Sequence, residues 1–334
     1  MAKQYPGYHM FVGQLGRETT LGTAVAATEI WRGTFGGFKD DRTRMVVEED
    51  IGLAAASDRM VDTYYAGSLP VNDTPANVEQ LCHLLEASIK AATPSGAGPY
   101  VRTYEYPVDG SANTLKPYTL RVGNSVVTAD HRVIPGALMK EVKLGGKQGE
   151  AWLMGGSWMG TRVISGALTG SLSPITVEDM PFSKTLLYLD ASGGTIGSTQ
   201  KTGVLLEAQI AIDPGVSYVP MGDGLLYPVA YVTGRPSVKF TLTYAFEQDG
   251  ADSFVATERG MWENNTARLL RLSYTGSSAS RKMVIDAAIR YDSVSEPKTF
   301  TDHVVGVTFE AHATYSAADS KYFSIEVTNS RATL

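Results

Sequence analysis

The sequence predicts a mainly β protein built from two tandem β-barrel or β-sandwich domains, each with one flanking α-helix. Three observations support this fold class. Hydrophobic and polar residues alternate with a period of two along many segments, two short stretches have the caps and apolar stripe of a helix, and both halves show a similar order of elements. At 334 residues the chain also exceeds the usual size of a single hydrophobic core.

The clearest strand lies between residues 237 and 246, where Val238, Phe240 and Leu242 fall on one face and Lys239 and Thr241 on the other. This alternation indicates a strand with one buried face. The same pattern predicts further strands in this half at Leu206 to Ile212, Leu270 to Tyr274, Met283 to Tyr291, Val305 to Tyr315 and Phe323 to Val327.

One helix is expected in each half. In the second half it covers Phe254 to Trp262, capped by Asp252 or Ser253 and interrupted by Gly260. In the first half it follows Thr74, the expected cap, with Pro75 at its first position, and ends near Ala92. Strands are predicted around the first helix at Met45 to Asp50, Met60 to Ala66, Val101 to Tyr106, Tyr118 to Val122, Leu138 to Leu144 and Ala151 to Met159.

Both halves therefore show two strands, a helix and then four strands, which suggests a structural duplication or two ordinary β-rich domains with the same order by chance. The predicted organisation is an extended arm over residues 1–40, a β domain over 41–164, a linker over 165–181 rich in Ser, Gly, Pro and Thr, and a second β domain over 182–334.

Two segments look extended and irregular: the N-terminal arm to about residue 38 and the stretch from Asp213 to Pro236. Trp31, Phe35 and Phe38 lie in the arm among glycines. Aromatic side chains on such a segment either contact a neighbouring chain or pack onto their own domain. We expect the first for both segments.

The composition and motifs give no support for an enzyme, a cofactor or a metal site. The net charge is −6, with 16 basic and 19 acidic residues up to Met180 and 13 and 16 after it, so neither half resembles a basic nucleic-acid reader. The single cysteine, Cys82, excludes an internal disulfide and fits synthesis in a reducing cytoplasm. No apolar run is long enough to span a bilayer.

The local motifs give no support for a phosphate-binding or metal site either. The glycine-rich run from Gly193 to Thr199 lacks the lysine of a phosphate-binding loop and is expected to be a tight turn. The five histidines show no metal-ligand spacing, and His83 and His312 are expected at the surface. The acidic run at Glu48 to Asp50 is interpreted as solvated charge.

This combination of features resembles the tail tube, or major tail, proteins of siphophages. The segments that carry the resemblance are Glu18 to Thr23 in the arm, the helix after Thr74, and the stretch from Phe182 to Gly203 that leads into a strand. The likeness is one of pattern and covers most of the chain.

The resemblance implies a structural virion protein whose sheets join between subunits, with stacked rings lining a channel for genome delivery. Such rings carry six domains, so two domains per chain imply a trimer with pseudo-sixfold symmetry, and one implies a hexamer. It also implies tape measure, tail tip and tail terminator proteins as partners, DNA that passes without specific binding, and a location in the virion tail. Trp31, Phe35, Phe38 and the 213–236 segment are then the candidate contacts between rings.

Two alternatives remain open from the sequence. A β-sandwich that binds carbohydrate or protein is one, with Tyr64, Tyr65, Tyr104 and Tyr106 as a possible aromatic platform. A hydrolase with a dispersed site is the other, and it requires a pocket that joins a histidine, a carboxylate and a nucleophile.

Overall fold

Antiparallel strands make up most of the molecule in the computed structural model, which describes residues 7–52, 54, 59–246, 253–301 and 303–334. The first half contains β1 (Phe11–Arg17), β2 (Glu29–Ile30), β3 (Lys39–Val46), β4 (Met60–Pro75), α1 (Val78–Ser88), β5 (Tyr100–Glu105), β6 (Tyr118–Asn124), β7 (Arg132–Lys147), β8 (Leu153–Gly160) and β9 (Ile164–Ser165).

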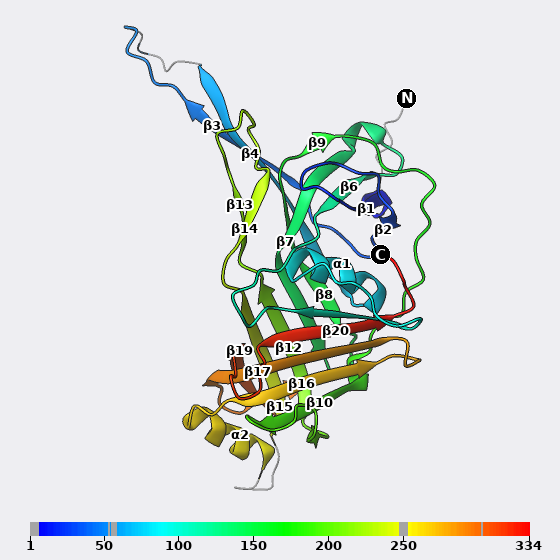
Figure 1. The fold of residues 1–334 in the computed structure, drawn as a ribbon, viewed down its shortest axis with the longest axis vertical. Coiled ribbons are helices and arrows are strands. Elements are labelled where there is room, and N and C mark those ends of the chain that lie inside the picture. Colours follow the sequence, from blue (N-terminus) through cyan, green and yellow to red (C-terminus); the bar gives the residue numbers. More distant parts are fainter. Residues whose placement is uncertain (1–6, 53, 55–58, 247–252, 302) are drawn as a thin grey trace.

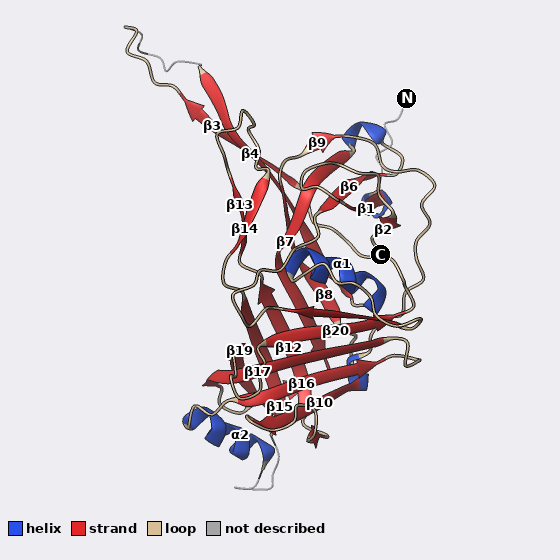
Figure 2. Cartoon of the chain, viewed as in Figure 1, coloured by secondary structure: helices blue, strands red, loops and turns tan. Residues whose placement is uncertain are grey.

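The second half begins after residues 166–181, which hold none of the named strands or helices. It contains β10 (Thr185–Ala191), β11 (Gln200–Lys201), β12 (Leu205–Asp213), β13 (Val216–Val219), β14 (Ala230–Thr233), β15 (Ser237–Ala245), α2 (Phe254–Glu263), β16 (Arg268–Thr275), β17 (Lys282–Val294), β18 (Lys298–Thr301), β19 (Val304–Ala313) and β20 (Phe323–Asn329). The mainly β fold expected from the sequence is therefore confirmed (Figure 2).

The two halves share one strand order. In the first half the neighbours run β1-β6-β7-β8-β4-β3, and in the second half they run β10-β16-β17-β19-β15-β12. Each helix follows the equivalent strand, α1 after β4 and α2 after β15. The repeat that the sequence suggested from element order alone thus extends to the pairing of the strands.

The halves are also joined by hydrogen-bonded strands. β12 of the second half pairs with β7 of the first, and β20 pairs with β5. In Figure 1, β8, β7, β12, β15 and β19 lie side by side behind a layer that contains β10, β16, β17 and β20, and the hairpin β3–β4 projects from the body. One apolar cluster runs through both halves, so the chain forms a continuous core.

A buried acidic residue anchors each helix to its sheet. Glu86 on α1 accepts hydrogen bonds from Arg17 and Tyr118, and Glu258 on α2 accepts them from Arg268 and Tyr291. Both carboxylates are fully buried, and a buried carboxylate needs such donors because leaving it unpaired is costly.

Several local expectations need correction. Helix α1 is capped by Asn77, whose side chain accepts a hydrogen bond from the Gln80 amide, while Thr74 and Pro75 end strand β4. Ser253 caps α2 as expected, but Gly260 lies inside that helix, and Asp252 is outside the described residues. The cap moves to Asn77 because β4 continues to pair with β8 as far as Pro75.

The segments expected to be irregular contain regular strands. β1 lies within the N-terminal segment and pairs with β6 along its whole length, and the 213–236 segment contains the hairpin β13–β14. β3 starts at Lys39, before the predicted Met45, so its first residues also come from the expected arm or its border.

Candidate assembly interfaces

Two kinds of surface stand out in this structure. One is the strand edges that pair with no other strand in the part of the chain that the structure describes, and the other is the face of β7, β12, β15 and β19 that points away from the core, which we call the open face. Among the described residues no group of three or more His, Cys, Asp or Glu side chains is placed to hold a metal ion. Neither described helix is long and apolar enough to cross a bilayer.

The join between the halves is an antiparallel pairing of Glu207–Ile212 in β12 with Val142–Lys147 in β7. On one face of this join Ala208, Ile210 and Ile212 are buried in the common core. Because the pairing joins two halves of the same strand order, it is a contact between one repeat and the next.

Matching β-bulges align the two repeats residue by residue. In β7 the register against β8 shifts between Met139 and Glu141, and in β17 the register against β19 shifts between Tyr291 and Ser293. Superposing these bulges makes Val142 equivalent to Val294. The β7 edge that receives β12, Val142 to Lys147, is then equivalent to the edge of β17 and β18 from Val294 to Thr299.

The same alignment identifies the first-half counterpart of the β12 segment that pairs with β7. Lys39 pairs with Ser68 in the first half and Ala211 with Lys239 in the second, and these pairs are equivalent. The segment of β12 that pairs with β7 therefore corresponds to residues 35–40, with Phe38 in the place of Ile210. This segment lies against β4 on one side, through the Phe35–Val71 bridge and the Lys39–Ser68 pair.

Within the described residues, no strand pairs with the outer side of residues 36–40 or with the equivalent edge of β17 and β18. Every residue of β3 is exposed. Unpaired strand edges attract further strands. The first repeat thus has a donor edge and the second an acceptor edge, each equivalent to an edge that is already paired inside the chain.

The aromatic residues of the N-terminal segment occupy different environments. Trp31 is buried in its own core at 4% exposure, which is the alternative that the sequence left open. Phe35 and Phe38 are half-buried and line a hollow of about 500 Å³ with Leu69 and Val122. Phe35 packs directly over Gly13, where a β-carbon would lie 1.9 Å from its ring.

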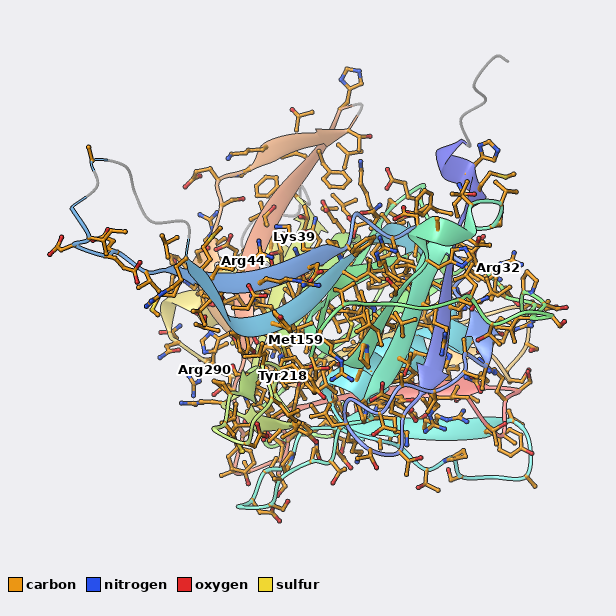
Figure 3. The ribbon with its side chains drawn as sticks, turned by 90° about the horizontal axis from the view of Figure 1, so that it is seen from above. Arg32, Lys39, Arg44, Met159, Tyr218 and Arg290 are labelled. Atoms are coloured by element: carbon orange, nitrogen blue, oxygen red, sulfur yellow. The ribbon has the colours of Figure 1, made fainter. Side chains whose placement is uncertain are left out.

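The hairpin β13–β14 contacts its own chain. The Tyr218 hydroxyl donates to the backbone oxygens of Gly136 and Met159, and Tyr231 accepts a hydrogen bond from the Leu115 amide (Figure 3). The Arg162 guanidinium lies 3.7 Å from the centre of the Tyr227 ring. This packing covers Leu138 and Met159 at one end of the open face of β7 and β8. Whether the segment also contacts another ring stays a prediction.

A buried polar network lies where α1 meets the two chain ends. His83 Nε2 is 3.2 Å from Glu29, its Nδ1 is 3.0 Å from the Tyr118 hydroxyl, and Arg331 pairs with Glu29 at 2.6 Å. The expectation of a surface His83 is wrong, because this helix is buried on every side. The sequence carries no signal for this burial, because Glu79, His83 and Glu86 recur at the spacing of a polar helix face.

The electrostatics of this network favour an ionised Glu29. Burial opposes its charge, but the hydrogen bond and charge of His83, the charge of Arg331 and a hydrogen bond from Gln80 outweigh burial and lower the Glu29 pKa to about 2. The network ties β2 and the C-terminal residues to α1.

The four tyrosines and the glycine-rich run singled out in the sequence do not form a binding site among the described residues. Tyr104 and Tyr106 are buried, so the four tyrosines considered as a carbohydrate platform do not form one surface. In the glycine-rich turn, Asp190 accepts hydrogen bonds from the amides of Gly197, Ser198 and Thr199, which agrees with the predicted turn.

No protein-family model matches the chain, and no curated protein matches it.

Proposed function

We propose that this chain is a structural protein that assembles with copies of itself into rings, and that the rings stack into the tail tube of a siphophage. The single observation that carries the proposal is the pairing of β12 with β7. It joins one repeat to the next, and the equivalent edges at residues 36–40 and in β17–β18 are left for other copies.

Repeating this pairing between chains gives a heterologous interface, in which residues 36–40 of one copy lie along Val294 to Thr299 of the next. Such an interface closes into a ring when the rotation per subunit divides the full circle, and otherwise forms a filament. Each chain contributes two repeats, so a ring of three chains would have six repeats around the axis. A hexamer of chains remains the alternative.

The joined sheet has one face in the core and one face that would form the wall of the channel. One face of β7, β12, β15 and β19 is buried in the core. The other carries Lys143, Gln209, Thr241 and Glu310, all of them polar. A polar face of this kind is suited to a water-filled channel through which a genome passes.

Negative-stain electron microscopy of the purified chain at increasing concentration, with size-exclusion chromatography, tests the proposal. We expect rings or tubes with a central hole, six repeating densities per ring and a mass of three chains per ring. A chain that stays monomeric at every concentration and ionic strength would count against self-assembly. Rings with twelve densities would contradict the trimer but would still agree with assembly into a tube.

Tape measure, tail tip and tail terminator proteins would be the further partners of such a tube. Their binding would be expected at the ends of the assembly or inside it, and the test above needs none of them.

A further inference from the structure

Basic residues are aligned across the open face of the joined sheet. Lys143 lies opposite Ala211, Ala211 opposite Lys239, Lys239 opposite His312, and His312 opposite Arg290, on the consecutive strands β7, β12, β15, β19 and β17. We call Lys143, Lys239, His312 and Arg290 the basic row. It runs across both halves of the chain at one level of the sheet.

Most members of the row have partners within the chain. Lys143 pairs with Glu141 at 3.2 Å, His312 pairs with Asp292 at 2.6 Å, and the Arg290 guanidinium donates to the backbone and side-chain oxygens of Asn265. Within the described part of the chain, the Lys239 ammonium forms no ion pair. Lys239 is exposed and lies at the centre of the row.

Two hollows lie beside the centre of the row. One, of about 410 Å³, is lined by Lys143, Lys147 and Lys239 together with Asp73, Glu150 and Glu207. The other, of about 690 Å³, is lined by Arg235, Lys239 and His312, with Asp109 and Asp292. Lys239 therefore reaches both hollows.

The second hollow also contains an aromatic side chain that is open to solvent. Tyr315 is 50% exposed there. Basic groups beside an exposed aromatic ring are the features with which proteins contact nucleic acid.

We propose that the basic row contacts the phosphate backbone of nucleic acid. This inference rests on the proposed function in that the row would face the channel, and it adds a contact that the resemblance does not imply. Acidic residues border the row on both sides, Glu141 and Asp213 next to Lys143 and Ala211, and Glu310 next to Lys239 and His312. Their charge makes the contact weak and sensitive to salt, as passage requires.

The test uses unassembled full-length chain, at concentrations where chromatography shows no oligomer, and a short duplex DNA followed by fluorescence anisotropy. The variant Lys143→Gln/Lys239→Gln removes one paired and one unpaired cation of the row. The control Lys90→Gln/Lys184→Gln removes one cation paired with Glu105 and one exposed cation elsewhere, so both variants change the net charge equally.

At about 20 mM salt we expect the row variant to bind at least fivefold more weakly than wild type and the control less than twofold more weakly. The slope of log K against log salt should fall by ~1.8 for the row variant, because each lost phosphate contact removes ~0.9. Equal losses in both variants, or no saturable binding by the wild type, would overturn the proposal.

Electron microscopy of the same variants separates the two proposals. If the variants form tubes but the row variant binds DNA like the control, the proposed DNA contact is wrong and the proposed tube assembly is retained. If no chain forms tubes but the row variant still binds DNA more weakly than the control, the proposed tube assembly is wrong and the proposed DNA contact is retained.

Discussion

Lys140 in β7 and Asp292 in β17 are each the extra residue of a β-bulge, and the two bulges lie at the same point of the shared strand order. A bulge bends its strand and increases the local twist. Here each bulge marks the point beyond which the strand no longer pairs with its neighbour on one side, so that this side becomes an edge of the sheet. In β7 that edge is filled by β12, and in β17 it is open among the described residues. The proposed assembly extends this relationship from one chain to the next.

Replacing Phe38 with Asp should abolish assembly without unfolding the chain. Phe38 is half-buried in the isolated chain, whereas its equivalent Ile210 is fully buried by the internal join. A charge at this position would be desolvated when the next copy docks. Microscopy should show no tubes while circular dichroism stays unchanged. Leu186→Asp, an exposed apolar position on β10, is the control and should assemble normally.

Thiol labelling should show which face of the sheet lines the channel. Cys82 is buried and its thiol pKa is raised to about 11, chiefly by burial, so the native thiol should not react. A cysteine at Thr241, on the open face, should react in assembled tubes with a small maleimide but not with one carrying a large polymer.

A cysteine at Thr257, exposed on α2, should react with both reagents. Equal labelling of Thr241→Cys by the large reagent in intact tubes would show that this face is outside.

Removing Arg268 should be strongly destabilising. Its guanidinium forms two hydrogen bonds to the fully buried Glu258, and Arg268→Met leaves that carboxylate with only the Tyr291 hydroxyl. Breaking a buried ion pair in this way costs about 3–5 kcal/mol of the free energy of unfolding. Urea denaturation measures the loss.

The double variant Glu258→Gln/Arg268→Met is the control for that measurement. It removes the unpaired charge and should recover much of the stability. A double variant as unstable as Arg268→Met would show that packing, and not the buried charge, causes the loss.

Glu29 should stabilise the fold above about pH 4.5 and lose this effect in acid. Its pKa falls from 4.5 to about 2 in the folded chain because His83, Arg331 and Gln80 outweigh the cost of burial. A lowered pKa means that the ionised form stabilises the folded state, by about 3 kcal/mol, and that this contribution is lost as pH falls from 4.5 toward 2.

The measurement is urea unfolding of wild type and Glu29→Gln at several pH values. The variant should be less stable at pH 6, and the difference should shrink as the pH approaches 2. Glu296→Gln, at an exposed position, should show no such convergence. A pH-independent difference would contradict the assigned charge on Glu29.

The sequence shows clearly where the second-half strands lie, because their apolar and polar residues alternate. Val238, Phe240 and Leu242 are buried and Lys239 is exposed, as the alternation predicts. The same signal is missing in β1, where Gly13 through Gly16 are buried on both faces, so the sequence predicts an irregular arm where the structure has a strand. A strand covered on both sides has no period of two to detect.

The tertiary structure alone decided which edges are paired and which are open. Alternation determines the face on which a side chain lies, but it carries no information on the neighbouring strand, since backbone hydrogen bonds do not depend on side-chain identity. The β7–β12 join, the basic row across five strands and the burial of His83 all depend on residues far apart in the chain. The sequence by itself therefore determined the β class, the two helices and the order of elements, and three-dimensional packing decided the candidate interfaces.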